Sequence, residues 1–348
     1  MKQMYKSVNE IGLRVEVLRD GGVYAILEPY SAPQVQMTAD SELCMSMKGD
    51  FLMPEKDIIW LKDRIRPVLI INGKEYPVGM FVGTTPKRAW KSGVQVLSLE
   101  SYSVLFLAQR VSIPSGYIIP AGTNYLGAVQ DLLRISGIDM YITEGTEKVT
   151  PTDRADWSAG TSVLSVINEL LSEINFRSAW VNLDGVVMLT KAGEVSANTV
   201  SHSYMEGEYS IIGGEPAVST DYFDKANVFR AICSNPDLPA PLVAEVVNDD
   251  PGNPMSTAVL GIRIVETQEV NSVADFEELQ EIASNMRRRA LETTETIEYV
   301  TALVPVVNAF DVVALDVSGE SGIWVEVGWT MTLDASGEMR HKAERVVI

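Results

Sequence analysis

Cysteine and histidine are scarce in this sequence, with two residues of each among 348. Cys44 and Cys233 lie far apart, so the paired spacing of a zinc site is missing and a disulfide scaffold is not expected in a chain of this length. We predict that both are buried free thiols. His202 and His341 are also widely separated, so a catalytic scheme that uses histidine would depend on one residue. We interpret His202 as a strand or surface residue.

Long apolar segments are absent as well. No stretch approaches the roughly 20 apolar residues that a membrane-spanning helix needs. The first residues also lack the apolar segment that is typical of a signal peptide. We therefore expect synthesis in the cytoplasm and no membrane insertion by this chain.

Basic residues are few, with 28 lysines and arginines against 47 aspartates and glutamates, which gives a formal net charge of −19. Such an acidic surface repels the phosphate backbone, so we predict no stable binding of nucleic acid. The acidity has two explanations. It keeps the protein soluble, or it lines a channel to which passing DNA must not adhere. Composition leaves both explanations open.

The short motifs of common catalytic sites are missing. The sequence contains no Gly-x-Ser-x-Gly elbow, no phosphate-binding loop that ends in Gly-Lys-Ser/Thr, and no His-Glu-x-x-His zinc helix. The acidic pair Asp249–Asp250 lacks the spaced oxygen ligands of a calcium loop, and Asp221 and Asp224 flank Tyr222-Phe223 in a predicted local turn. We interpret both pairs as solvated loop residues. We therefore predict no catalytic, cofactor-binding or metal-binding residues, no cofactor, and a protein that is not an enzyme.

The first hundred residues have the pattern of short antiparallel strands. Apolar and polar residues alternate at positions 13–17, and Asp20-Gly21-Gly22 separates them from a second apolar run. Asn72-Gly73 supplies two residues that tolerate positive φ, as a type I′ hairpin requires. Apolar residues then recur at every second position of 76–82, where Pro77 indicates an edge strand because it lacks a backbone N–H. This pattern predicts a small barrel or sandwich.

Between about residues 110 and 195 the pattern becomes helical. Thr123 can cap a first helix that ends at Gly137, and Thr161 or Ser162 can cap a second. The apolar stripe of the second helix comprises Val163, Val166, Ile167, Leu170, Leu171 and Ile174. A short hairpin follows. The segment is therefore predicted to be a compact α/β module.

The last third of the sequence returns to a turn-rich β pattern. A proline-rich segment at 234–241 and a loop at 248–254 precede a long helix, which begins near Ser272 and has a capping-box pattern with Asp275. The predicted apolar face of this helix comprises Phe276, Leu279, Ala283, Met286 and Ala290. Beyond it, the odd-numbered residues of 325–333 are predicted to occupy one face of a strand.

These patterns together predict a mainly β chain with α+β character. Two β-barrel domains flank a small two-helix α/β module. The predicted domains are residues 1–109, 110–195 and 196–348, and the last includes the long helix at about 272–293. The similar order of elements in the two β regions suggests a diverged duplication.

Two stretches of the sequence resemble a known family. The first runs from Asp63-Arg64-Ile65-Arg66-Pro67 through Asn72-Gly73 to Tyr76-Pro77-Val78-Gly79-Met80-Phe81. The second runs from Ala226-Asn227-Val228-Phe229-Arg230-Ala231 through Asn253-Pro254 to Leu260-Gly261-Ile262-Arg263. In pattern and order over most of the chain, the sequence is similar to the baseplate-hub or tail-hub proteins of bacteriophages and phage-derived injection particles, the group that includes the late control protein D type.

The resemblance implies a tube-like barrel at each stretch and a homotrimer that forms a pseudo-sixfold ring. Such a trimer is a structural hub that joins the hexameric tail tube or distal tail ring to a threefold spike or fibre, and it forms part of the DNA channel. The implied partners are a tail tube or distal tail protein, a spike or central fibre protein, and a tape measure protein. The implied location is the tail tip or baseplate of the virion, after assembly in the host cytoplasm, with a role in host entry and genome ejection.

Two other functions remain as alternatives. A receptor- or carbohydrate-binding tail protein would need exposed aromatic residues grouped on one loop face, whereas Trp60, Trp90, Trp157 and Trp180 are scattered along the sequence. A tail-associated peptidase would need a nucleophile or a set of metal ligands, and no such motif is found.

Overall fold

The chain forms two compact units. The computed structural model describes residues 10–155, 157–191, 197–207, 210–220, 225–233, 241–270, 276–291 and 293–347. Unit 1 comprises Met1–Pro216 and Glu298–Ala343, and unit 2 comprises Ala217–Ile297 and Glu344–Ile348. Most of unit 2 is therefore an insertion between two parts of unit 1.

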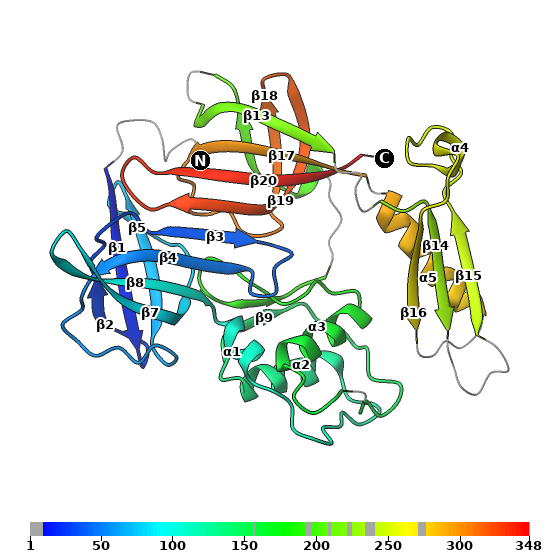
Figure 1. The fold of residues 1–348 in the computed structure, drawn as a ribbon, viewed down its shortest axis with the longest axis horizontal. Helices are drawn as coiled ribbons and strands as arrows, with labels where there is room; N and C mark the ends of the chain where they lie inside the picture. The colour runs from blue at the N-terminus through cyan, green and yellow to red at the C-terminus, as the bar shows by residue number, and fades with distance from the viewer. Residues whose placement is uncertain are drawn as a thin grey trace. The chain divides into compact units, whose positions relative to one another are not determined.

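A large sheet joins strands from both ends of the chain (Figure 1). Its early strands are β1 (Ile11–Arg19), β2 (Gly22–Leu27), β3 (Gln34–Thr38), β4 (Met45–Leu52), β5 (Arg64–Ile71), β6 (Lys74–Pro77), β7 (Phe81–Lys91) and β8 (Val94–Ser103). Its later strands are β12 (Val200–Met205), β13 (Ile212–Thr220), β17 (Thr293–Ala302), β18 (Val312–Val317), β19 (Glu320–Thr332) and β20 (Glu338–Val347). The order β13-β17-β20-β19-β3-β4-β8-β7-β5-β1-β2 places β19 directly beside β3. The two β regions are thus continuous through this pair.

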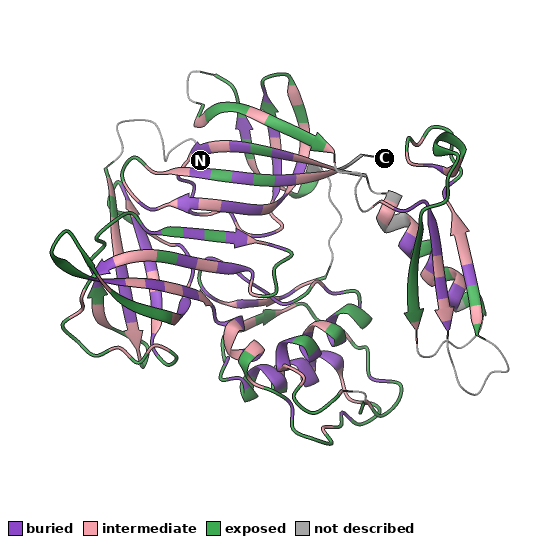
Figure 2. Ribbon diagram, viewed as in Figure 1, coloured by how far each residue is buried: buried purple, intermediate pink, exposed green. Residues whose placement is uncertain are grey.

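The predicted hairpins of the first region are present. β1 pairs antiparallel with β2, and β5 pairs with β6. Asn72 and Gly73 have φ of 52° and 79°, so both turn residues adopt the left-handed conformation that the sequence predicted. Pro77 lies at the end of β6, whose recorded pairing is with β5 alone, as expected for an edge strand. Buried and exposed residues alternate along the strands of this sheet (Figure 2).

Strand β19 differs from its predicted alternation. Trp329, Met331 and Leu333 are buried as expected, but in the first half of the strand Trp324 and Glu326 are the buried residues. The change of buried face falls at Gly328 and Trp329, which are both buried, and there the neighbour of β19 also changes: residues 320–325 pair with β18, and residues 328–332 pair with β3. The prediction of one apolar face was therefore wrong for half of the strand.

The α/β module contains α1 (Leu105–Arg110), α2 (Tyr125–Ile135), α3 (Val163–Glu173) and a three-stranded sheet of β9 (Tyr141–Thr143), β10 (Trp180–Val181) and β11 (Val187–Leu189). The residues of the predicted α3 stripe are all buried, and Ser162 caps the helix by accepting a hydrogen bond from the Ser165 N–H. The cap of α2 is Asn124 instead of the predicted Thr123. The Asn124 side chain reaches the N–H of Gly127, whereas the Thr123 hydroxyl donates to the Pro120 carbonyl.

Unit 2 consists of a three-stranded sheet packed on one helix. The sheet order is β15-β14-β16, with β14 (Val228–Cys233), β15 (Leu242–Val247) and β16 (Val265–Val270). Helix α5 (Phe276–Leu291) packs against the sheet through Leu279 and Ala283, and the short helix α4 (Thr257–Leu260) lies in the loop region after β15. Phe276 was predicted on the buried face of the helix, but it is 53% exposed at the first turn. That part of the prediction was wrong.

The prediction of a mainly β chain that includes an α/β module is confirmed. The second stretch that carries the family resemblance was expected to open a barrel. It forms β14 of the smaller sheet of unit 2. The domain boundaries at 109 and 195 remain a prediction, and unit 2 lies wholly within the predicted third segment. The predicted capping box at Ser272 and Asp275, the acidic pair Asp221–Asp224 and residues 234–240 lie outside the described residues.

Candidate interaction surface

The connection between β4 and β5 carries four consecutive large apolar residues at 58–61, which we name the apolar loop. Two of them are exposed: Ile59 to 52% and Leu61 to 59%. Ile58 and Trp60 are half-buried. Successive side chains thus alternate between the protein and the solvent, and the exposed pair faces outward from unit 1.

Trp60 attaches the apolar loop to β7. A Cβ atom added to Gly83 would lie 2.7 Å from Cε3 of the Trp60 indole. Optimal carbon–carbon contacts are roughly 3.5–4.0 Å, so only glycine leaves room for the ring at this position. Gly83 also lies where the register between β7 and β8 shifts, a common location for a strand glycine.

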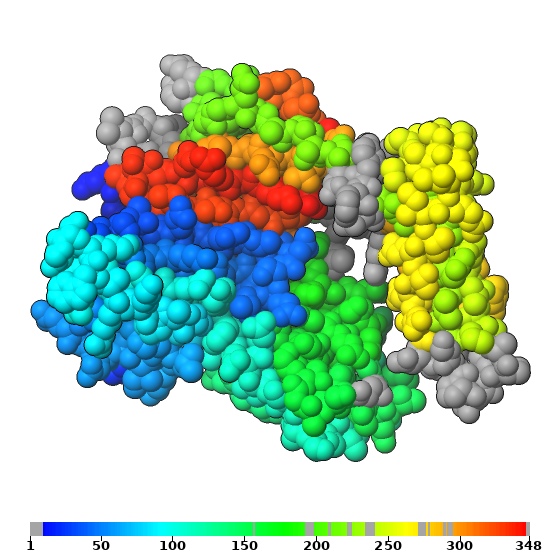
Figure 3. Space-filling model, in the orientation of Figure 1, coloured from blue at the N-terminus to red at the C-terminus, as the bar shows by residue number. Residues whose placement is uncertain are grey.

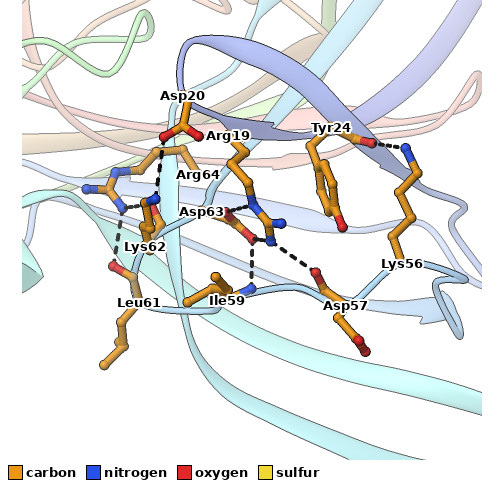
Figure 4. A network of polar contacts seen from close by, with 10 residues as sticks. All are labelled: Arg19, Asp20, Tyr24, Lys56, Asp57, Ile59, Leu61, Lys62, Asp63 and Arg64. Atoms are coloured by element: carbon orange, nitrogen blue, oxygen red, sulfur yellow. Dashed lines mark hydrogen bonds and ion pairs between the residues drawn. The ribbon is translucent and has the colours of Figure 1, made fainter.

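Asp63 fixes the C-terminal end of this connection. Its side chain is buried, with the residue only 1% exposed. It accepts two hydrogen bonds from Arg19 of β1, from Nε to Oδ1 at 2.8 Å and from Nη2 to Oδ2 at 2.7 Å (Figure 4). The backbone N–H of Ile59 donates to the same Oδ2 at 2.7 Å. The Arg19 guanidinium holds the pKa of the Asp63 carboxyl below its usual value, so the group is charged at neutral pH.

Arg19 also contacts Tyr24 and the backbone of Asp57. Its Cζ atom lies 3.8 Å from the centre of the Tyr24 ring, a cation–π contact, and its Nη2 donates to the Asp57 carbonyl at 3.0 Å. Lys56 Nζ donates to the Tyr24 carbonyl at 2.6 Å and lies 4.8 Å from the same ring (Figure 4). These contacts join the β1–β2 hairpin to the connection that carries the apolar loop.

The arrangement offers a fixed apolar surface. Single exposed apolar residues are common, but Ile59 and Leu61 lie close together in a segment that is fixed by a buried charged hydrogen-bond network. A surface that is already ordered loses little conformational entropy when it binds. Its chemistry is burial of apolar side chains against another protein surface.

The structure shows a buried polar cluster that the sequence did not predict. His341 Nδ1 lies 3.1 Å from Glu326 Oε1, and His341 Nε2 lies 2.9 Å from Thr301 Oγ1. The Tyr299 hydroxyl donates to Glu326 Oε2 at 2.9 Å, and its ring stacks on His341 with centroids 4.4 Å apart. Burial raises the pKa of Tyr299 well above its usual value. Because the side chains of His341 and Glu326 are fully buried, this cluster belongs to the core of unit 1 and is not open to a substrate.

The other candidate residues are not brought together. His202 lies in β12 as predicted, with Nε2 at 3.0 Å from Asp311 Oδ2, and Asp250 is an exposed loop residue. Cys44 and Cys233 are buried free thiols as predicted, and burial raises the pKa of Cys44 to about 11. Among the described residues, no group of three or more histidine, cysteine or acidic side chains is arranged to hold a metal ion. None of the helices described is long and apolar enough to cross a membrane.

Comparison with known proteins identifies the fold. No protein-family model and no curated protein matches the sequence. Solved structures match nearly the whole chain. The tail protein from Neisseria meningitidis MC58 has a TM-score of 0.69 at 12% identity, covering 96% of this chain and 97% of that one. This is the fold of a phage tail protein.

Two further structures agree with this fold. The 43 kDa tail protein of prophage MuSo2 from Shewanella oneidensis has a TM-score of 0.69 at 12% identity, covering 96% of this chain and 98% of its own. An E. coli component of the type VI secretion system, which is described as similar to the T4 bacteriophage tail proteins gp27 and gp5, has a TM-score of 0.53 at 10% identity. Here the match covers 97% of this chain and 77% of that one.

Within this tail-protein fold, the sequence signal for the apolar loop was incomplete. The run Ile58–Leu61 and the acid that follows are visible in the sequence, and Asp63 begins the first stretch that carries the family resemblance. The partner of Asp63 was not predicted, because Arg19 lies 44 residues earlier in a different hairpin. The signal that could have indicated this surface was the apolar run Ile58–Leu61, followed by Asp63 directly before strand β5.

Proposed function

We propose that this chain is the structural hub of a phage-type tail. In this proposal three copies form a ring that joins the tail tube or distal tail ring to a threefold spike or fibre. The observation that supports it is the tail-protein fold over 96% of the chain, shared with two tail proteins at a TM-score of 0.69. The E. coli structure, which is described as similar to the T4 bacteriophage tail proteins gp27 and gp5, also supports a role in a tail.

The proposed partners are other tail proteins. They are a second and third copy of this chain, a tail tube or distal tail protein, a spike or central fibre protein, and the tape measure protein. The apolar loop is proposed as one surface for these contacts, since Ile59 and Leu61 are exposed in a fixed segment. The proposed location is the tail tip or baseplate of the virion, with a role in host entry and genome ejection.

The proposed role is structural and requires no cofactor. Neighbours with this fold are tail proteins, and the buried cluster around His341 is closed to a substrate. Purified protein is expected to lack stoichiometric metal or bound nucleotide. Metal analysis that finds one zinc ion per chain would contradict this part of the proposal.

The acidity of the chain is proposed to serve the channel. Three copies carry a formal charge of 3 × (−19) = −57. An acidic channel wall does not exchange counterions with the DNA backbone, so DNA slides past instead of adhering. The protein is accordingly expected not to bind duplex DNA at physiological salt, where the Debye length is about 8 Å. A trimer structure with a neutral or basic lumen would leave solubility as the explanation of the charge.

The decisive experiment is the oligomeric state and shape of the purified protein. Analytical ultracentrifugation should give three times the 38.2 kDa subunit mass, and negative-stain electron microscopy should show a ring with threefold symmetry. A receptor-binding protein or a peptidase does not need this geometry. A monomer at about 100 μM, or a compact particle without a central opening, would contradict the proposal.

A further inference from the structure

The hairpin formed by β7 and β8 extends beyond the sheet that carries it. The recorded pairing of β7 with β5 is confined to Phe81 and Ile65, whereas β7 pairs with β8 along its whole length to Lys91. On the other side, β8 pairs with β4 only from Val96 onward. Residues 90–95 therefore form a two-stranded end of the hairpin, and residues 85–89 of β7 are the free edge beside β8. We name residues 85–95 the ribbon, which lies at the edge of unit 1 in the space-filling view (Figure 3).

This ribbon has a composition unlike the rest of the chain. It carries three basic residues, Lys87, Arg88 and Lys91, and the sequence from 76 to 99 contains no aspartate or glutamate. Trp90 is 73% exposed at the tip. Lys91 forms an ion pair with Asp50 of β4, whereas Lys87 and Arg88 are exposed. Arg88 lies two residues before Trp90 and therefore on the same face of β7. A basic, aromatic projection is thus presented by a protein with a net charge of −19.

A complementary surface lies on the three strands β12, β18 and β19. Register places Ser203, Ala314 and Ile323 in one row across the strands and Met205, Asp316 and Ser321 in the next. These residues line an open depression of about 270 Å³. Ala314 and Gly322 keep it open because they have little or no side chain, while Met205, which is 59% exposed, and Ile323 supply apolar walls. Small-molecule sites are usually larger, roughly 300–1,000 Å³, so this depression suits one inserted side chain.

The rim of the depression has the opposite charge to the ribbon. Glu206, Asp316 and Glu320 lie at the adjoining ends of the three strands, and Asp316 lines the depression itself. The Glu206 carboxylate accepts a hydrogen bond from the Ser318 N–H at 2.7 Å, which fixes its place at the β18–β19 turn. The sequence contains no lysine or arginine in segments 197–207 and 312–324. Acidic residues, of which Glu206 and Asp316 are exposed, therefore border the depression, and the ribbon carries the exposed bases Lys87 and Arg88.

We propose that the β7–β8 ribbon of one subunit docks on the β12–β18–β19 face of the next, with Trp90 in the depression and Arg88 beside Asp316. This inference rests on the proposed ring and identifies a contact that closes it. The two surfaces lie at different ends of unit 1 (Figure 1), so the ribbon of one molecule cannot reach the depression of the same molecule. When two different surfaces of the same chain bind each other, the subunits associate head to tail. Such subunits form a closed ring if the rotation from one subunit to the next is a whole fraction of a turn. Charge complementarity favours a second copy over nucleic acid, because the acidic half of the contact is on this chain.

A charge-swap experiment on the full chain tests this contact. Three variants, Trp90→Ala, Arg88→Asp and Asp316→Arg, should each raise the dissociation constant of the trimer at least tenfold in sedimentation velocity, as is usual for aromatic and arginine residues at the centre of an interface. The double variant R88D/D316R should recover most of the loss because it restores an opposite-charge pair. Ile142→Ala and Lys148→Asp, at exposed positions of the α/β module, are matched controls that should leave the trimer unchanged. Far-UV circular dichroism confirms that each variant is folded.

The outcomes separate this contact from the hub proposal. A trimeric wild type whose assembly is unaffected by the three variants would overturn the contact and leave the hub proposal standing. A wild type that is monomeric at about 100 μM would overturn both. Failure of the double variant to recover would overturn the Arg88–Asp316 pairing. Salt-sensitive DNA binding that R88D abolishes would assign the ribbon to nucleic acid and overturn the inference.

Discussion

Replacing Asp63 by asparagine removes one buried negative charge while keeping the size of the side chain. In the wild type the carboxylate accepts three hydrogen bonds, two from Arg19 and one from the Ile59 N–H, at 2.7–2.8 Å. An asparagine has one acceptor oxygen, so its NH₂ group must face at least one of these donors. The variant therefore loses hydrogen bonds and also leaves Arg19 without its counter-charge.

The expected loss is about 3 kcal/mol in the free energy of unfolding. Removing one partner of a buried ion pair costs roughly 3–5 kcal/mol, and the lower end applies because Arg19 is partly exposed and can regain water. Urea unfolding followed by tryptophan fluorescence measures this loss in unit 1, since all six tryptophans of the chain lie there. Asp57→Asn is the matched control, because it makes the same charge change at an exposed side chain of the same connection.

The pH dependence follows from the direction of the pKa shift. The Asp63 pKa is lower in the folded protein, so its stabilisation is present above the unfolded-state value of about 3.9 and is lost as the pH falls through the folded-state pKa. The difference between wild type and D63N should accordingly be constant from pH 6 to 8 and should shrink below about pH 3.9. A loss under about 0.5 kcal/mol at pH 7, or one equal to that of D57N, would refute the idea that the Asp63–Arg19 pair stabilises unit 1.

Further substitutions test the packing directly. Leu170→Ala should cost roughly 2–5 kcal/mol in thermal or urea unfolding, because Leu170 is fully buried in α3. Gly83→Ala should cost roughly 1–3 kcal/mol and change Trp60 fluorescence, because the added methyl group meets the indole at 2.7 Å. Asn124→Ala should cost about 1 kcal/mol through the lost cap of α2, and Thr123→Ala should cost less. Equal losses for the last two variants would contradict the assignment of the cap.

Local features were predictable because neighbouring residues determine them. Asn72-Gly73 forms its hairpin since both residues accept positive φ, whatever surrounds them. The α3 stripe is buried as predicted because a period of 3.6 residues places those side chains on one face. The mainly β class and the position of the helical module follow from the same short-range patterns.

The ends of helices α2 and α5 show where short-range sequence patterns no longer predict the structure. Thr123 and Asn124 are both acceptable helix caps by residue type. The Thr123 hydroxyl donates to the Pro120 carbonyl, while the Asn124 amide donates to the Lys148 carbonyl, and Asn124 is the residue that caps α2. Phe276 fits the period of α5 but lies at its first turn, beyond the sheet that covers Leu279 and Ala283. Periodicity identifies a face of a helix and does not give the extent of the surface that covers it.

By itself the sequence determined the hairpins, the amphipathic stripe of α3, the free thiols and the mainly β class, because each depends on residues within a few positions of one another. Tertiary structure decided that the second half of β19 pairs with β3 of the first region, and that the buried face of β19 changes along its length. It also decided that Asp63 meets Arg19, and that the second resemblance stretch lies in the sheet of unit 2. These contacts join segments far apart in the chain, and which segments meet depends on the packing of the whole unit.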